Sequence, residues 1–129
     1  MRRFVTKDSK KDFYILYTLA FALISGFIFY QFSHNGKSLV WSHDGIPQHL
    51  NSLAYYGRYL REILHRIFIE HKLSVSMWDM NIGYGSDILT TLHYYVIGDP
   101  LTLLSVFVPA DKTEILYEVL IFLRIYLAG

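Results

Sequence analysis

The sequence predicts an all-α membrane protein, in which a transmembrane helix is followed by an exported loop with short amphipathic helices and by the start of a second transmembrane helix. Three observations predict this fold class. The 129 residues are 53% hydrophobic and 17% aromatic, which is high for a soluble domain. Residues 13–32 contain no charged side chain. The segments that follow show apolar residues at helical spacing.

Composition also excludes several classes of function. The net charge is only +1 and the basic residues do not gather in one stripe, so we expect no nucleic-acid partner. The chain has no cysteine, which excludes disulfides, thiol catalysis and cysteine-ligated metal sites.

Residues 13–32, FYILYTLAFALISGFIFYQF, form the predicted transmembrane helix. At about 1.5 Å per residue this run crosses a hydrocarbon core of roughly 30 Å, so the lipid bilayer is the first expected partner. Tyr14 and Tyr17 near one end and Tyr30 near the other suit the two headgroup layers. No small-residue cleavage site follows, so the helix is expected to be retained. The alternative is a buried helix of a soluble protein.

The orientation of this helix follows from its flanks. Lysine and arginine outnumber acidic residues in residues 1–12, where Arg2, Arg3, Lys7, Lys10 and Lys11 stand against Asp8 and Asp12. Because positive flanks stay inside, residues 1–12 are predicted to be a cytoplasmic tail and residues 33–114 an exported first loop.

The loop begins with a turn and continues with an amphipathic helix. Asn35-Gly36 is a turn signal. Residues 48–70 place Leu50, Leu53, Ala54, Gly57, Leu60, Leu64, Ile67 and Phe68 on one face, and Arg58, Arg61, Glu62 and His65 on the other. Such a helix either lies in the headgroup layer and attracts anionic groups, or packs its apolar face on neighbouring helices.

The remainder of the loop has clear helix boundaries. Residues 76–85 carry two glycines and no sustained period, which predicts an ordered loop. Ser86 or Asp87 is expected to cap a short helix that runs through Tyr95. Gly98-Asp99-Pro100 then forms a break, with Asp99 as a cap and Pro100 at the first helical position. That helix should stop by Pro109.

Residues 115–129 are predicted to begin a second transmembrane helix. Asp111 and Glu114 have the spacing of a capping box at its start. The segment is apolar except for Glu118 and Arg124, and it is shorter than the roughly 20 residues that a span requires. We therefore expect the natural polypeptide to continue, and the two charges to face further helices.

Several distinctive segments together resemble one protein family. They are KSLVWSHDGIPQHL (residues 37–50), YGRYLRE (56–62), WDMNIGYGSD (78–87), the run from Tyr94-Tyr95 to GDPL (94–101), and LRIYLAG (123–129). From about Lys37 to Gly129 the chain resembles the amino-terminal region of the bacterial YfhO-type membrane proteins.

The resemblance implies a function and a location. Members of this family are long, multi-pass proteins of Gram-positive cell membranes with a GT-C glycosyltransferase architecture. They would transfer a sugar from a polyprenyl-phosphate donor to an envelope polymer, such as lipoteichoic acid, on the outer face. This chain would supply the first helix and the extracellular first loop, and it would be inactive alone. The alternative is a non-enzymatic transporter or flippase component, which would depend on Glu118 and Arg124 within the spans.

The resemblance also implies catalytic residues. GT-C enzymes carry a catalytic carboxylate in the first exported loop, and Asp44 is the matching position. It would take the proton of an acceptor hydroxyl or hold a divalent cation, so the cofactor stays open. The alternative is that Asp44-Gly45 is only a turn in which glycine accepts a positive φ. Asp79 is the second catalytic candidate, not from the resemblance but because it stands before two glycines whose flexibility would let the loop close over a sugar. His43, Asp44 and His49 are a weaker hypothesis for a metal site.

Four further residues are expected to bind substrate. Arg58 and Arg61 would stabilise the anionic phosphate of the leaving lipid. Trp78 and Tyr84 would stack on a sugar ring. The alternative for the arginines is snorkelling to the headgroups, and for tryptophan it is anchoring at the membrane interface.

Overall fold

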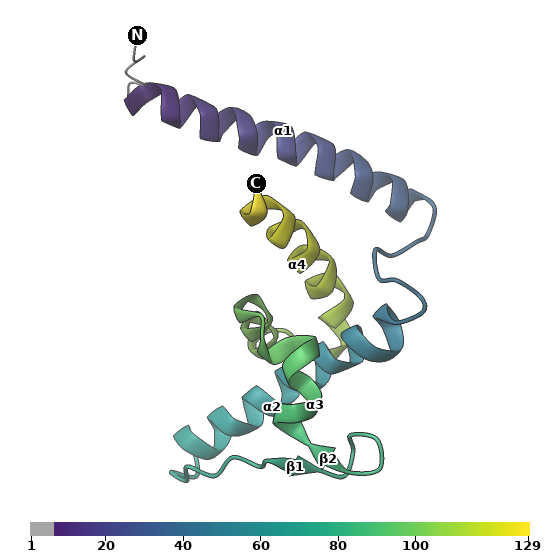
Figure 1. Cartoon of the computed structure of the whole chain (residues 1–129), viewed down its shortest axis with the longest axis vertical. Helices are drawn as coiled ribbons and strands as arrows, with labels where there is room; N and C mark the ends of the chain where they lie inside the picture. Colours follow the sequence, from purple (N-terminus) through teal and green to yellow (C-terminus); the bar gives the residue numbers. More distant parts are fainter. Residues whose placement is uncertain (1–6) are drawn as a thin grey trace. The chain divides into compact units, whose positions relative to one another are not determined.

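The computed structural model describes residues 7–129, with side chains from Lys10 onward, and this part of the chain is mostly helical (Figure 1). The predicted all-α class is therefore confirmed. The chain divides into two compact units, one from Val40 to Arg124 and one that joins the residues up to Leu39 with Ile125–Gly129. Arg2 and Arg3, on which the predicted orientation partly rests, lie outside the described residues, so the orientation stays a prediction.

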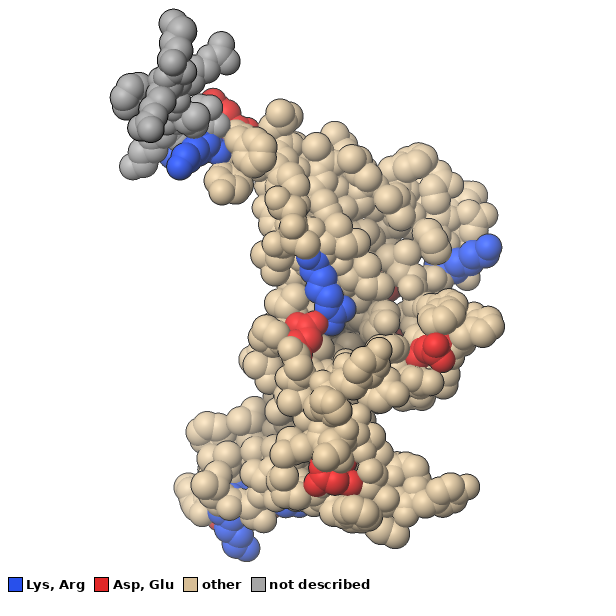
Figure 2. All heavy atoms as spheres, viewed as in Figure 1, with Lys and Arg blue, Asp and Glu red and all other residues tan. Residues whose placement is uncertain are grey.

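Helix α1, Lys7–His34, contains the predicted span and extends beyond it at both ends. Its segment Lys10–His34 is long and apolar enough to cross a membrane, and among residues 7–129 no other helix meets this test. Its apolar side chains are exposed along its length, which suits contact with lipid tails. In Figure 2 the charged side chains of this helix gather at the end next to the grey residues.

Helix α1 ends at the predicted Asn35-Gly36 turn. The Gly36 amide donates to the Ser33 carbonyl at 3.0 Å, and the Lys37 amide donates to the Phe32 carbonyl at 2.9 Å. These bonds satisfy the last carbonyls of the helix. Gly36 has a φ of 62°, a conformation that glycine adopts without steric cost.

The predicted amphipathic helix is present but begins earlier. A π-helical turn, η1 (Gly45–Leu50), leads directly into helix α2 (Asn51–Phe68). The predicted apolar face is wrong towards the end of α2, where Leu64 is 42% and Phe68 69% exposed. Tyr56 and Tyr59 are buried instead. The aromatic rings of these two tyrosines pack into the core. The buried side of α2 therefore differs from the face that the aliphatic residues predict.

The predicted outward position of Arg61 is also wrong. Arg61 is half-buried, and its Nη1 donates to the carbonyls of Ser105 at 2.9 Å, Val106 at 3.3 Å and Val108 at 2.8 Å. These carbonyls lie at the end of the 3₁₀ helix η3 (Pro100–Phe107), where a helix leaves acceptors without partners. Arg61 therefore ties α2 to η3.

The predicted ordered loop forms a short hairpin beside α2. Strand β1 (Trp78–Asp79) pairs antiparallel with β2 (Ser86–Asp87), with Trp78 opposite Asp87 and Asp79 opposite Ser86. Helix α3 (Ile88–Leu92) follows, and the π-helical turn η2 (His93–Ile97) extends it. Of the two predicted caps, Asp87 is the one used, since its carboxylate accepts the Thr90 amide at 2.8 Å.

The predicted break and the following helix are confirmed. Pro100 stands at the first position of η3, and the Asp99 carboxylate accepts the Leu101 amide at 2.9 Å. The helix ends at Phe107, before Pro109. Asp99 also forms an ion pair with Arg124, whose Nε lies 2.6 Å from Oδ2. The expectation that Arg124 faces further helices is therefore wrong, because its partner lies within the Val40–Arg124 unit.

The predicted capping box is wrong. Asp111 lies inside the 3₁₀ turn η4 (Ala110–Lys112), and the last helix, α4, runs from Thr113 to Ala128. Pro109 precedes η4 in an extended conformation, so the turn starts too early for Asp111 to act as its cap. The second transmembrane helix, which α4 is predicted to begin, stays a prediction.

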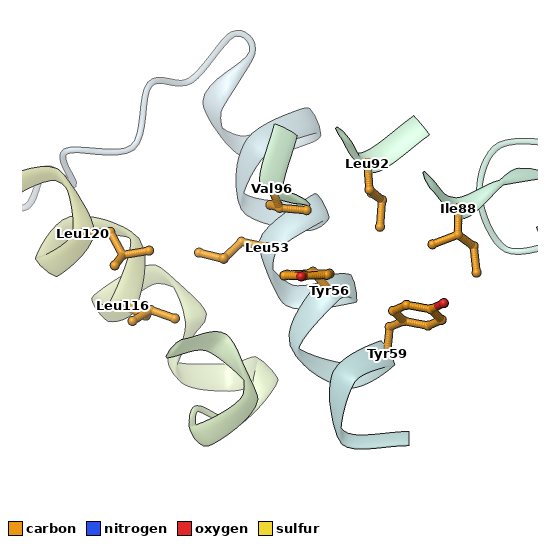
Figure 3. Close-up of a cluster of buried hydrophobic side chains, with 8 residues drawn as sticks. All are labelled: Leu53, Tyr56, Tyr59, Ile88, Leu92, Val96, Leu116 and Leu120. Carbon is orange, nitrogen blue, oxygen red and sulfur yellow. The ribbon is translucent and has the colours of Figure 1, made fainter. Parts of the chain in front are cut away.

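The core of the Val40–Arg124 unit joins α2, α3, η2 and α4 (Figure 3). Its buried apolar side chains are Leu53, Tyr56, Tyr59, Ile88, Leu92, Val96, Leu116 and Leu120. Gly57 lies where η3 approaches α2 most closely, since a Cβ built there would stand 2.5 Å from the Ser105 carbonyl oxygen. This packing fixes the hairpin and α3 against one side of α2, where the candidate site lies.

Candidate functional site

A groove of about 380 Å³ lies between α2 and the hairpin, and we call it the first groove. It brings together three of the six residues that the sequence predicts for the site, namely Arg58, Trp78 and Asp79. Its lining residues are Tyr55, Arg58, Tyr59, Glu62, Arg66, Ser76, Trp78, Asp79, Met80, Asn81 and Ile88. The volume lies in the range of small-molecule sites.

The Asp79 carboxylate is the best-organised group of the first groove. Tyr55 donates its hydroxyl to Asp79 Oδ2 at 2.5 Å. Asn81 donates its backbone amide and its side-chain Nδ2 to Oδ1, each at 2.8 Å. The Tyr55 bond first, and the Asn81 backbone bond next, hold the pKa of Asp79 below its ordinary 3.8. Asp79 is therefore a fixed anion and a weak base.

Tyr55 contacts both the Asp79 carboxylate and the guanidinium of Arg58. Burial, and then the bond to Asp79, raise the pKa of Tyr55 well above its ordinary value, so its hydroxyl stays a donor. The Arg58 guanidinium lies 5.2 Å from the centroid of the Tyr55 ring. A guanidinium at this distance is attracted by the ring face. Arg58 is exposed and is thus presented to a ligand.

The other groups of the first groove suit a polar, uncharged ligand. Glu62 and Arg66 form an ion pair across one turn of α2, so their charges cancel. Trp78 is 57% exposed. An exposed indole beside carboxylate, amide and hydroxyl groups matches the chemistry of a sugar, which has an apolar face and many hydroxyls.

A second groove, of about 440 Å³, adjoins the first and shares Tyr55, Arg58 and Asn81 with it. Its lining residues are Pro47, Asn51, Ser52, Ala54, Tyr55, Arg58, Arg61, Asn81, Ile82, Gly83, Thr91, Leu92 and Ala110. Both predicted arginines are present, whereas no carboxylate belongs to this lining. The second groove is therefore cationic.

Asp44 lies outside both grooves, so the structure does not bring the two predicted catalytic carboxylates into one pocket. It is exposed on the turn before η1 and accepts a hydrogen bond from Gln48 Nε2 at 3.2 Å. Gln48 Oε1 in turn accepts the Tyr95 hydroxyl at 3.0 Å. Sequence reasoning missed both partners, although Asp44 and Gln48 stand four residues apart, the spacing of neighbours on a helix.

The turn at Asp44-Gly45 is real, but the predicted reason for its glycine is wrong. Gly45 is not among the described residues with positive φ. It is buried, and a Cβ there would stand 3.2 Å from side-chain atoms of both Val40 and Trp41. Glycine is therefore favoured by close packing at this turn.

The structure does not gather the residues of the weaker metal-site hypothesis as ligands. Within residues 7–129, no three histidine or acidic side chains come together as metal ligands. His43 instead stacks on Trp41, with ring centroids 5.5 Å apart, and His49 packs on the edge of Tyr95 at 5.2 Å. Both histidines thus have aromatic neighbours.

Tyr84 lies at the tip of the hairpin, fully exposed at 103%, and lines neither groove. Conversely, the grooves contain two residues that sequence reasoning missed, Tyr55 and Asn81. The spacing of Tyr55 and Arg58 places them on one face of a helix, and Asn81 follows Asp79 at the distance of a turn bond. These were the available signals.

Comparison with known proteins identifies a family. Residues 16–129 match a family described as bacterial membrane protein YfhO. No curated protein and no solved structure matches the chain. The match covers most of the sequence, including the larger part of α1 and both grooves, and α1 has the length and composition of a membrane helix. The chain therefore belongs to the YfhO family of bacterial membrane proteins.

Proposed function

We propose that this chain is the amino-terminal part of a multi-pass membrane glycosyltransferase. The enzyme would move a sugar from a polyprenyl-phosphate donor to an envelope polymer, such as lipoteichoic acid, on the outer face of a Gram-positive cell membrane. The N-terminus would then be cytoplasmic and residues 33–114 extracellular. The first groove carries this proposal, because Arg58, Trp78 and Asp79 lie together there with the chemistry of a sugar site.

The two carboxylates take different roles in this proposal. Asp79 already accepts three hydrogen bonds and has a lowered pKa, so it suits the orientation of sugar hydroxyls better than proton transfer. Asp44 accepts one side-chain bond, from Gln48, and is open to solvent. Asp44 therefore keeps lone pairs for the acceptor and is the proposed base.

The reaction is a substitution at the anomeric carbon of the donor sugar. Asp44 takes the proton of the acceptor hydroxyl as its oxygen bonds to this carbon. The bond from the carbon to the phosphate oxygen breaks, and its electron pair leaves with the lipid phosphate. Arginine side chains stabilise the charge that develops on the phosphate. Gln48, held by Tyr95, is a positioning residue for the Asp44 carboxylate.

The steps above use no divalent cation, and a cation held by Asp44 stays the alternative role of this carboxylate. Among the described residues, Asp44 is not part of a group of three side chains that could hold a metal ion. Because Mg²⁺ is commonly held by one or two carboxylates together with substrate phosphates, the donor phosphate would complete such a site.

The test measures glycosylation of the envelope polymer by mass shift, in cells whose only copy of the full-length protein carries one substitution. Asp44→Asn should abolish the added sugar at an unchanged level of protein in the membrane. Asp79→Asn should reduce it, because an amide orients hydroxyls less well than a carboxylate. Asp111→Asn is the matched control, since Asp111 is an exposed carboxylate in η4 outside both grooves. Full glycosylation in the Asp44→Asn cells would refute the proposed base.

The alternative, a non-enzymatic transporter or flippase component, would depend on charges in the last helix. Arg124 already has a structural partner, because it pairs with Asp99 at the start of η3. Because Arg124 is already used to hold η3 in place, it is less suited to a role in transport, and this favours the enzyme. If Arg124→Gln stopped export of a lipid-linked sugar while Asp44→Asn had no effect, the transporter would be the better account.

A further inference from the structure

We infer that the exposed face of η3, formed by Leu103, Leu104 and Phe107, inserts into the lipid surface of the membrane. This short helix would then seat the Val40–Arg124 unit on the bilayer. The inference goes beyond the proposed function, because contact with phospholipid requires no transfer of sugar. It starts from the polarity of η3, which is the reverse of that of a helix that faces water.

The side of η3 that packs on α2 is small and polar. Thr102 and Ser105 are both buried. The Thr102 hydroxyl lies 2.6 Å from the carbonyl oxygens of Val96 and Asp99, which accept its proton. Ser105 lies against Gly57, where a Cβ would stand 3.1 Å from the Ser105 Cβ. Small side chains here let η3 approach α2 closely, so the polar residues of η3 are the ones that the unit buries.

The exposed face of η3 carries large apolar side chains instead. Leu103 and Leu104 are exposed, and Phe107 is 82% exposed. Side chains three residues apart eclipse one another in a 3₁₀ helix, so Leu104 and Phe107 form one row. An apolar row of this kind is unfavourable in water and marks a surface that contacts protein or membrane.

The chain on either side of the unit leads to membrane helices. Residues 35–39 join it to α1, which has the length and composition of a membrane helix. Residues 108–112 join η3 to α4, the predicted start of the second span. Pro47, close to the first connection, and Ala110, in the second, line the same groove. The two connections therefore lie at one end of the unit, and η3 stops directly before one of them.

The residues between η3 and α4 suit the headgroup layer. Asp111 and Lys112 of η4 are exposed charges, and Thr113 begins α4. If α4 enters the bilayer at its first turn, these charges lie among the headgroups. The exposed face of η3 then lies at the boundary between headgroups and acyl chains.

The composition of this face favours lipid over a protein partner. From Pro100 to Phe107 no polar or charged side chain is exposed. The face therefore offers no hydrogen bond or ion pair by which one protein surface would be selected over another. Leucine and phenylalanine are typical of the apolar side of helices that lie in the membrane interface. Acyl chains require only apolar area, which this face supplies.

The experiment places p-benzoylphenylalanine, a photoreactive analogue of phenylalanine, at Phe107 of the full-length protein in its bacterial membrane. The matched control places it at Tyr84, an exposed aromatic residue at the tip of the hairpin. Leu104, in the same row as Phe107, is a second test position in case one variant does not fold. After irradiation the probe bonds to the nearest C–H group. The adduct keeps all atoms of both partners, so mass spectrometry of the purified protein identifies the neighbour.

The probes at Phe107 and Leu104 should gain the mass of a phospholipid, and the probe at Tyr84 should not. Attachment of the Phe107 and Leu104 probes to another segment of the protein would overturn the inference, because a protein helix would then cover η3. The absence of any adduct at both positions would overturn it too, since the face would lie in water. Phospholipid adducts equally abundant at Tyr84 would show that contact with lipid is not particular to η3. A phospholipid adduct on a protein that adds no sugar would refute the proposed enzyme alone.

Discussion

The contact between α2 and η3 depends on Gly57, so Gly57→Ala should destabilise the Val40–Arg124 unit. The Cβ of an alanine would stand 2.5 Å from the Ser105 carbonyl oxygen and 3.1 Å from the Ser105 carbonyl carbon. Both are backbone atoms, so no side-chain rotation relieves the clash. η3 must move away from α2, and this stretches the bond from Arg61 to the same Ser105 carbonyl.

Two opposing effects set the size of the change. Alanine favours a helix over glycine by about 1 kcal/mol. Overpacking of a close contact costs about 1–3 kcal/mol, and weaker bonds from Arg61 add to this cost. The net loss should be about 1–2 kcal/mol, equivalent to a fall in the unfolding midpoint of roughly 4–8 °C per kcal/mol for a unit of this size.

The assay is thermal unfolding of the chain in detergent, followed by circular dichroism. Gly26→Ala in α1 is the matched control, since a Cβ at Gly26 meets nothing within 4 Å. The control should leave the midpoint unchanged or raise it, because only helix propensity acts there. If Gly57→Ala proved as stable as Gly26→Ala, the close approach of η3 to α2 would be wrong.

Two further predictions concern charged groups. Because the folded pKa of Asp79 lies below 3.8, the bonds from Tyr55 and Asn81 should stabilise the hairpin fully at neutral pH and be lost as the pH falls through that lowered pKa. Fluorescence of Trp78 in a Trp41→Phe chain should follow this loss, and a hairpin that stays equally stable below pH 3.8 would contradict it. Arg124→Gln should cost less than about 1 kcal/mol, since the pair with Asp99 is partly exposed. Asp99→Ala should cost about 1 kcal/mol more than Arg124→Gln, because Asp99 also caps η3, and equal unfolding midpoints for the two variants would argue against the cap.

Local rules were sufficient for much of the architecture. The length and composition of an apolar segment do not depend on what packs against it, so the sequence is enough to predict a membrane helix. Helix α1 contains the predicted residues 13–32. Asp87 and the Asp99-Pro100 pair also act at the predicted helix starts. Capping depends on one side chain and the amides of the next turn, so the sequence alone contains the necessary information.

The partners of polar side chains required the tertiary structure. Arg61 lies on the polar side of α2 by sequence spacing, but the end of η3, more than 40 residues later, supplies carbonyls that draw it inward. The buried side of α2 likewise depends on what packs against Tyr56 and Tyr59. No periodicity within one helix contains this information, because a partner helix determines which face is covered.

For the candidate site too, the sequence supplied one part of the information and the tertiary structure the other. Residue chemistry and family resemblance, read from the sequence alone, indicated Asp44, Asp79, Arg58, Arg61, Trp78 and Tyr84. Only the tertiary structure placed Trp78, Asp79 and Arg58 in one groove, Arg61 in a second, and Asp44 and Tyr84 outside both. The physical reason is that a groove forms where separate segments meet, and the sequence shows which side chains can act but not which of them lie within reach of one ligand.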